Sequence, residues 1–201
     1  MSLPVLWSFR RCPYAMRARL ALDVSGIAYE HREILLSDKP AAFLAASPKG
    51  TVPVMVNGDR IIEESIDIML WALDQNDPQD WLDMPDEGFA LIRENDGPFK
   101  TALDRFKYHT RFTDVDIETE RLKAAHFLQP LDQRLRAAPF LFGSQVRLAD
   151  MAIFPFIRQF ANADRDWFDA QQLPGLQNWL DRHLASDRFA RIMVKHAPWE
   201  Q

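Results

Sequence analysis

The only cysteine of the chain, Cys12, stands in the stretch RRCPYAMRARLAL, directly before a proline. Proline is favoured at the first position of a helix, so Pro13 predicts a helix that begins there, with Cys12 at its N-terminal end. The unpaired amides and the dipole of such an end stabilise an anion, and Arg10, Arg11 and Arg17 add positive charge. Surroundings of this kind lower the pKa of a thiol, and the thiolate is the reactive form.

Two interpretations of Cys12 remain open at this point. It is either a nucleophilic or redox-active thiol, or one of the many free cysteines that are buried and inert. A dithiol motif would carry a second cysteine three residues later, where this chain has Ala15. If Cys12 is redox active, a thiol from outside the chain must therefore resolve any disulfide that it forms.

Composition narrows the classes of function. The chain has 201 residues, of which 47% are hydrophobic and 26% are charged, and its net charge is −5. This balance is typical of a globular protein, and the acidic charge argues against general binding to nucleic acid or to an anionic membrane. No apolar run is long enough to span a bilayer, the N-terminus does not resemble a secretory signal, and one cysteine cannot form an internal disulfide. A cytoplasmic protein is expected.

The histidines give no sign of a metal site. The five of them are scattered along the chain without the spacing of metal ligands. The sequence therefore predicts no metal.

The first part of the chain predicts alternating strands and helices. Apolar runs, alternation and turn signals such as Asn57-Gly58-Asp59 set their limits. The expected strands are residues 4–9, 28–34, 52–56 and 60–62, and the expected helices are residues 13–25, 40–46 and 64–74. The order βαβαββα is the outline of a thioredoxin-like α/β domain, which we place at residues 1–76.

Strand signals fade after this domain. Residues 77–86 contain two prolines and several aspartates, and we interpret them as a linker. Residues 87–201 are expected to form an all-α domain, with helical stretches at about 87–110, 117–137, 148–162, 174–185 and 187–195.

Several stretches together resemble the cytosolic glutathione S-transferase superfamily. They are CPYAMRARLAL, SDKP, SPKGTVPV and EES in the first domain and RLADMAIFPFIRQF in the second. None is decisive alone, but their order and spacing follow the family over nearly the whole chain. The resemblance is greatest to cysteine-type members, which are the omega class and monothiol, glutaredoxin-like bacterial relatives. It implies the GST fold, glutathione as co-substrate and a homodimer.

The resemblance also implies roles for single residues. Cys12 matches the catalytic position. Val52 and Pro53 match a turn with a cis proline, where the backbone before the proline pairs with the cysteinyl part of glutathione. Glu64 and Ser65 match the pair that receives the γ-glutamyl group. Lys39 is similar to the lysine that pairs with the glycyl carboxylate in omega-like members.

Each of these residues also has an ordinary structural explanation. Glu-Glu-Ser before an apolar run is a plain helix start, Lys39 alone is a solvated lysine, and Pro53 alone opens a strand. As a set they suit a peptide with two carboxylates and one ammonium group. Ser65 and the free amides of a helix start would bind one carboxylate, Lys39 would bind the other, and Glu64 would bind the ammonium.

The second domain supplies a fold signal and a pocket hypothesis. Asp150 matches the acidic residue of the family's capping box, but Arg147 stands where a Ser or Thr is usual, so half of the box is missing. A second-substrate pocket would be lined by aromatic side chains, for which the candidates are Trp7, Phe9, Tyr14 and Phe106, although the sequence favours Phe106 as a core residue.

Three functions are weighed. The leading hypothesis is glutathione-dependent thiol transfer by Cys12, which covers deglutathionylation and the reduction of small disulfides or dehydroascorbate. The first alternative is conjugation of glutathione to an electrophile, which needs a hydroxyl near the glutathione thiolate. Ser8 is the nearest one but is poorly placed within the first strand. The second alternative is a non-catalytic binding protein of the same fold. No nucleic acid or membrane partner is expected.

Overall fold

The structure, a computed structural model, describes residues 2–113 and 115–200. The chain divides into two compact units. The first consists of the chain up to Asp80 together with the residues from Ser186 onward, and the second is Trp81–Ala185. The first unit contains the sheet, and the second is helical.

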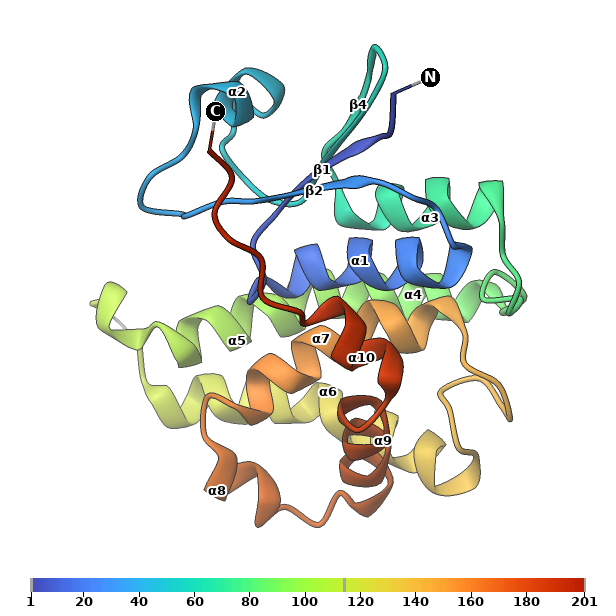
Figure 1. The fold of residues 1–201 in the computed structure, drawn as a ribbon. Coiled ribbons are helices and arrows are strands. Elements are labelled where there is room, and N and C mark those ends of the chain that lie inside the picture. Colours follow the sequence, from blue (N-terminus) through green and yellow to red (C-terminus); the bar gives the residue numbers. More distant parts are fainter. Residues whose placement is uncertain (1, 114, 201) are drawn as a thin grey trace. The chain divides into compact units, whose positions relative to one another are not determined.

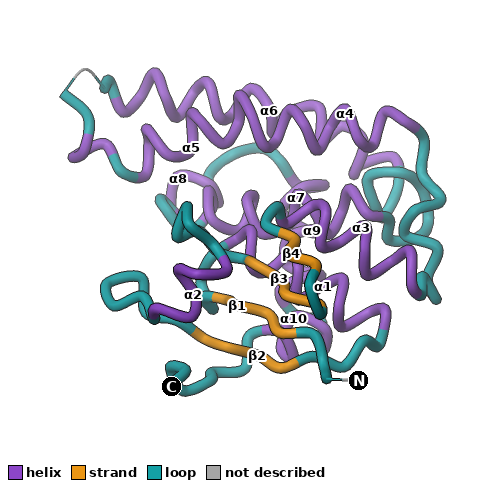
Figure 2. The backbone as a smooth tube through the Cα atoms, turned by 90° about the horizontal axis from the view of Figure 1, so that it is seen from above, coloured by secondary structure: helices purple, strands orange, loops and turns teal. Residues whose placement is uncertain are grey.

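Four short strands form one mixed sheet in the order β2-β1-β3-β4, which Figure 2 shows from above. β1 (Val5–Ser8) is parallel to β2 (Glu30–Glu33) and antiparallel to β3 (Val54–Asn57). β3 is antiparallel to β4 (Arg60–Ile62), and the two-residue turn between them has Gly58 at a φ of 60°. The first of the two turn residues has a positive φ, which glycine adopts without strain, so Gly58 is the residue of the Asn57-Gly58-Asp59 signal that makes this hairpin.

Helices connect these strands in the expected order. α1 (Pro13–Ser25) begins at its proline and ends at Gly26, whose φ of 67° is the left-handed value that glycine adopts without strain. α2 (Ala41–Ala46) precedes β3, and α3 (Ser65–Gln75) follows β4. Figure 1 shows α1 and α3 packed side by side on one face of the sheet. The predicted thioredoxin-like arrangement βαβαββα is confirmed.

The other face of the sheet has a small aromatic core. Trp7, Ile34, Phe43 and Val54 form it, with Trp199 packed against them. The ring of Trp7 is 5.6 Å from that of Phe43 and 5.0 Å from that of Trp199, measured between centroids. Only 2% of Trp7 is exposed. The prediction that Trp7 lines an open pocket is therefore wrong, because its ring is buried in this core.

The end of the chain belongs to the first unit, whereas we expected it in the helical domain. α10 (Asp187–Ile192) packs on α1, and Asp23 of α1 binds Arg188 at 3.3 Å and Arg191 at 2.7 Å. Beyond it, Trp199 donates its backbone N–H to Glu33 at 2.7 Å, alongside the edge strand β2. An edge strand presents unpaired backbone groups, and the chain end covers them.

The helical unit begins at Trp81, inside the expected linker. Trp81 is fully buried, and its carbonyl accepts the Leu148 N–H at 2.8 Å, so this part of the segment is anchored. The expected helical stretches are present with small shifts. The elements are α4 (Asp86–Glu94), a π-helix η1 (Asn95–Phe99), α5 (Lys100–Lys107), a 3-10 helix η2 (His109–Arg111), α6 (Ile117–Ala137), α7 (Leu148–Ala161), α8 (Arg165–Asp169) and α9 (Pro174–Leu184).

One helix of this unit was not expected. α8 is only five residues long and is started by the Asp164 side chain, which accepts the Trp167 N–H at 3.0 Å. A helix this short leaves no apolar periodicity to find in the sequence. Among the residues that the structure describes, no helix has both the length and the apolar character needed to cross a membrane.

Asp150 organises the start of α7. Its carboxylate accepts N–H groups from Arg147 at 3.0 Å, from Leu141 at 2.9 Å and from the Trp179 indole at 2.9 Å. The acidic half of the capping box is thus formed although Arg147 replaces the usual hydroxyl residue. The two further donors, from a loop and from α9, extend a helix cap into a buried link within the helical unit.

The Asp23 cluster makes the attachment of α10 depend on pH. Burial raises the pKa of Asp23, but the hydrogen bonds and charges of Arg191 and Arg188 outweigh it and leave the pKa below its ordinary value of 3.8. Stability from this group is present above that value and is lost as the pH falls through the lower, folded-state pKa. Asp23→Asn should therefore lower the thermal midpoint at neutral pH, and the difference from wild type should shrink on acidification.

This prediction is checked by thermal unfolding of both proteins from about pH 7 to about pH 3. Asp74→Asn, at an exposed position of α3, is the matched control and should show no such dependence. A difference between wild type and Asp23→Asn that stays constant over this range would contradict the assignment.

Candidate active site

Cys12 lies where the first strand gives way to the first helix. It is the N-cap of α1, is partly exposed and is followed by Pro13 at the first helical position. A turn brings the chain round, since Cys12 donates its N–H to the Phe9 carbonyl at 3.0 Å. The first turn of α1 carries no acidic residue. The positive end of the helix dipole therefore faces the thiol, and no carboxylate from the first turn of α1 itself opposes it.

The loop before β3 approaches this thiol from forty residues away. The Cys12 thiol donates to the Val52 carbonyl, with 3.7 Å between sulfur and oxygen. The Val52–Pro53 peptide bond is cis, as the resemblance implies. Three of the predicted residues, distant in sequence, are thus brought together at one end of the sheet.

Ser65 is joined to the same region through α1. It is the buried first residue of α3, and the Arg17 guanidinium donates to its hydroxyl at 3.4 Å. The sequence suggested only that Arg17 adds positive charge near Cys12. In the structure Arg17 is fully buried and links α1 to the start of α3, so it holds Ser65 at a defined distance along the helix from the thiol.

Glu64 and Lys39 lie on the accessible side of these loops. Glu64 is the N-cap of α3, its side chain is 70% exposed, and its carboxylate is 3.7 Å from the Lys49 ammonium, which also lies 3.8 Å from Glu63. Lys39 is half-buried, and its ammonium lies against Gly50. The ammonium is 3.2 Å from the position that a Cβ atom would take if residue 50 were not glycine. Sequence reasoning missed Lys49, although it lies in the quoted SPKG turn and shows that Glu64 can bind an ammonium group.

The aromatic candidates separate between the two units. Phe9 and Tyr14 are half-buried next to residues 9–12, which we call the thiol turn. The Arg11 guanidinium lies 5.6 Å from the centre of the Phe9 ring, and the Arg17 guanidinium lies 5.7 Å from that of Tyr14. Both remain predictions as second-substrate residues.

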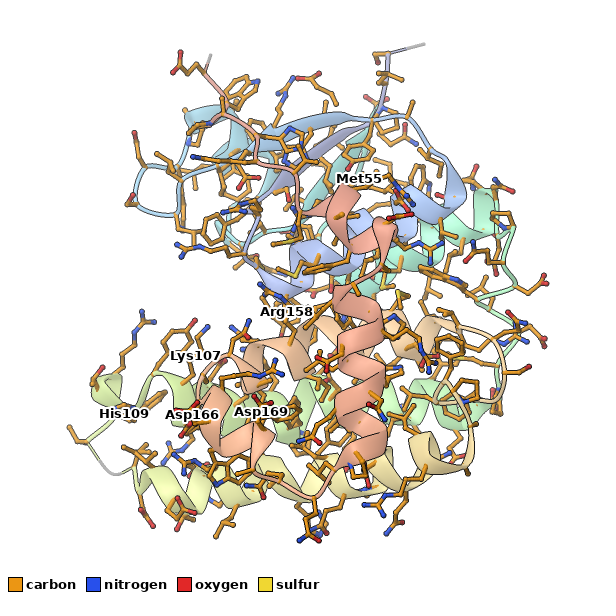
Figure 3. The ribbon with its side chains drawn as sticks, turned by 60° about the horizontal axis from the view of Figure 1, so that its bottom comes forward. Met55, Lys107, His109, Arg158, Asp166 and Asp169 are labelled. Carbon is orange, nitrogen blue, oxygen red and sulfur yellow. The ribbon has the colours of Figure 1, made fainter. Side chains whose placement is uncertain are left out.

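Phe106 belongs to the helical unit. It is 6% exposed and lines a hollow of about 250 Å³ together with Lys107, His109, Arg121 and Asp164. Figure 3 shows Lys107 and His109 on the same side of this unit as Asp166 and Asp169 of α8. Its role toward a second substrate also remains a prediction, because nothing in the unit itself relates the hollow to Cys12.

Comparisons with known proteins agree with this geometry. The model of the glutathione S-transferase N-terminal domain matches residues 6–81, and that of the C-terminal domain matches residues 110–182. The chain is 25% identical to glutathione S-transferase DHAR2 of Arabidopsis thaliana, over 94% of this chain and 89% of that protein. It is 27% identical to a probable maleylacetoacetate isomerase of Vibrio cholerae, over 98% of both.

Solved structures show the same fold. A glutathione transferase family member from Pseudomonas fluorescens, determined with two glutathione bound, matches with a TM-score of 0.81 at 18% identity. The match covers 96% of this chain and 92% of that one. The two domain models together span well over half of the sequence, and the residues that they cover include Cys12, Val52, Pro53 and Ser65. The chain therefore belongs to the glutathione S-transferase superfamily.

Proposed function

We propose that the protein is a cysteine-type glutathione transferase in which Cys12 carries out thiol transfer. The observation that carries this proposal is the 3.7 Å approach of the Cys12 sulfur to the Val52 carbonyl. In the family, the backbone at this position pairs with the cysteinyl part of glutathione. A glutathione bound in that way would bring its sulfur next to Cys12, at the positive end of α1.

The other predicted ligands fit the rest of glutathione. Ser65 and the first-turn amides of α3 suit the γ-glutamyl carboxylate, and Glu64 suits its ammonium, since it already pairs with the ammonium of Lys49. Lys39 would bind the glycyl carboxylate as a point charge. These groups come from three separate loops of one unit, which is consistent with an extended peptide lying across them.

The proposed chemistry needs no residue beyond Cys12. Its thiolate attacks the glutathionyl sulfur of a mixed disulfide, so that a disulfide forms between Cys12 and glutathione while the other sulfur leaves and takes a proton. A second glutathione thiolate then attacks the same glutathionyl sulfur and releases glutathione disulfide and the Cys12 thiolate. Each mixed disulfide consumes one reduced glutathione, which becomes half of the glutathione disulfide together with the glutathionyl group of the substrate, and this external thiol is needed because the chain has a single cysteine.

Conjugation of glutathione to an electrophile is the second candidate, and membership of the superfamily favours it. Such a reaction benefits from a hydroxyl that donates to the glutathione thiolate. Ser8 does not suit this task, because it is fully buried within β1. The relatives include a probable maleylacetoacetate isomerase, but thiol transfer and reduction of small disulfides or dehydroascorbate agree better with a cysteine at this position.

A non-catalytic role and the assembly state are tested directly. A binding protein that had lost the glutathione site would not be retained on immobilised glutathione, whereas we expect this protein to be retained.

We also propose that the protein forms the homodimer that the family resemblance implies. Sedimentation velocity would detect this dimer.

Replacing the thiol should separate the two reactions. We expect Cys12→Ser to lower glutathione-dependent reduction of a small mixed disulfide by at least about a hundredfold, because the nucleophile is lost. Conjugation of glutathione to a model aryl halide should be kept or increased, since a hydroxyl can donate to the glutathione thiolate. Calorimetric glutathione affinity serves as the control and should be nearly unchanged. Full disulfide reductase activity in the variant would refute the mechanism.

Two lysines provide a matched pair for testing the binding mode. Lys39→Met should weaken glutathione binding by about three- to tenfold, more at low than at high ionic strength, because an ion pair with the glycyl carboxylate is lost. Lys49→Met should not weaken glutathione binding. The Lys49 ammonium pairs with the carboxylate of Glu64, the residue proposed to bind the glutathione ammonium, so it competes with the ligand for that carboxylate. Titration calorimetry at two salt concentrations measures both. Equal weakening by the two substitutions would contradict the assignment of Lys39.

A further inference from the structure

Two buried charged side chains form hydrogen bonds to the backbone of Arg10, two positions before Cys12. The carboxylate of Glu33, on β2, accepts the Arg10 N–H at 2.6 Å. The guanidinium of Arg19, on α1, donates to the Arg10 carbonyl at 2.7 Å. Glu33 is 7% exposed and Arg19 is 2% exposed. Both hydrogen-bonding groups of one backbone residue are thus bound by buried side chains that come from two different elements.

Arg10 lies where the chain leaves the sheet, so the path of its backbone sets the direction of the thiol turn. β1 ends at Ser8, α1 begins at Pro13, and the turn between them is closed by the bond from the Cys12 N–H to the Phe9 carbonyl. Arg10 lies inside this turn, so fixing its peptide groups fixes the path by which Cys12 reaches the helix end.

The charges themselves are compatible with this role. Burial raises the pKa of Glu33, but hydrogen bonds from His31 and from the Arg10 amide outweigh it, so the net pKa is below its ordinary value. Burial lowers the pKa of Arg19, and the nearby charge of Glu33 opposes that effect. A buried carboxylate and guanidinium are costly to desolvate. In this protein the Glu33 carboxylate accepts a hydrogen bond from the backbone of the thiol turn, and the Arg19 guanidinium donates one to it.

The chain end completes the environment of Glu33. Its second carboxylate oxygen is 2.9 Å from Nε2 of His31, and the ring of His196 stacks on His31 with 3.9 Å between centroids. The Glu33 carbonyl accepts the Trp199 N–H at 2.7 Å. Residues 196–199, which we call the C-terminal strap, thus contact Glu33 at its backbone carbonyl and, through His31, at its carboxylate.

We propose that Glu33 is a positioning residue for the Cys12 thiol and that the C-terminal strap holds Glu33 in place for this task. The proposal rests on the proposed function only in assigning the reaction to Cys12. Glu33 touches neither Val52 nor Ser65 nor Lys39 in the hydrogen bonds that fix it. Its loss should therefore lower kcat and leave the KM for glutathione nearly unchanged.

Two conservative substitutions separate a positioning hydrogen bond from a mere charge. Glu33→Gln keeps the length of the side chain and an oxygen that can accept the Arg10 N–H, but it removes the charge. Glu33→Asp keeps the charge but shortens the reach by one methylene. If Glu33 acts by positioning, Gln should retain at least about half of kcat, whereas Asp should lose about fivefold or more, with glutathione KM within about twofold of wild type in both.

A second readout does not depend on glutathione. Because Cys12 is the only thiol, its alkylation by iodoacetamide in the absence of glutathione reports the state of this one residue. Glu33→Asp should slow alkylation about threefold or more, as the relaxed turn moves the thiol away from the helix end, and Glu33→Gln should remain near wild type. If wild type had no glutathione-dependent activity, the proposed function would fail while the alkylation rates still tested the positioning role.

The strap is tested by Trp199→Ala, which lies outside the helices and strands and leaves the Glu33 side chain intact. We expect kcat to fall by about twofold or more with KM unchanged. Combined with Glu33→Asp it should cause little further loss, because the strap acts through Glu33. Glu94→Asp, at an exposed position of α4 in the helical unit, is the matched control and should change neither kcat nor the alkylation rate.

Several results would overturn the proposal. They are a greater loss in Gln than in Asp, equal losses in the two, no loss in either, and additive losses when Trp199→Ala is combined with Glu33→Asp. Should Glu33→Asp fail to fold, Trp199→Ala and Glu33→Gln still decide the matter. Unchanged kcat and alkylation in Trp199→Ala would then reject the role of the strap, and a fivefold loss of kcat in Glu33→Gln would reject positioning by a hydrogen bond.

Discussion

Proline at position 13 constrains the site more than any other single residue does. It has no N–H to give to the preceding turn, and its fixed φ suits the first position of a helix. α1 consequently begins directly after Cys12, which leaves the thiol at the N-cap. The position of Cys12 in the field of the helix follows from that starting point, and the Val52 carbonyl then approaches the thiol from forty residues away.

The same helix carries two buried arginines that extend this constraint to its neighbours. Arg17 points to Ser65 at the start of α3, and Arg19 points back to the carbonyl of Arg10 in the thiol turn. Neither guanidinium is free to bind substrate from a solvated surface. α1 is therefore a frame that sets the distance between the thiol and the start of α3, where the γ-glutamyl group is proposed to bind.

The chain end supports this frame from the other side. β2 is the edge of the sheet, and it carries Glu33. The strap pairs with that edge through the Trp199 N–H, and the Arg32 guanidinium lies 4.9 Å from the ring of Trp7 and 4.7 Å from that of Trp199. An aromatic contact, a backbone hydrogen bond and a buried carboxylate thus connect the last residues of the chain to the loop of the first helix.

The sequence by itself determined the features that depend on local backbone chemistry. Pro13 and Gly26 limit α1, Gly58 makes the turn of the β3–β4 hairpin, and the family motifs bring Cys12 and Pro53 into one framework. Only the tertiary structure decided which partner each buried polar group has. Nothing local in the chain says that Arg17 meets Ser65 or that Asp150 binds three donors.

The same holds for the chain end and for Trp7. The sequence of residues 187–195 predicts one more helix of the second domain, and a short apolar strand does not reveal which of its aromatic rings closes a core. The physical reason is that propensities act between neighbours in sequence. Burial, ion pairing and the covering of a sheet edge are settled by residues that meet only after folding, and these far contacts leave no periodicity in the chain.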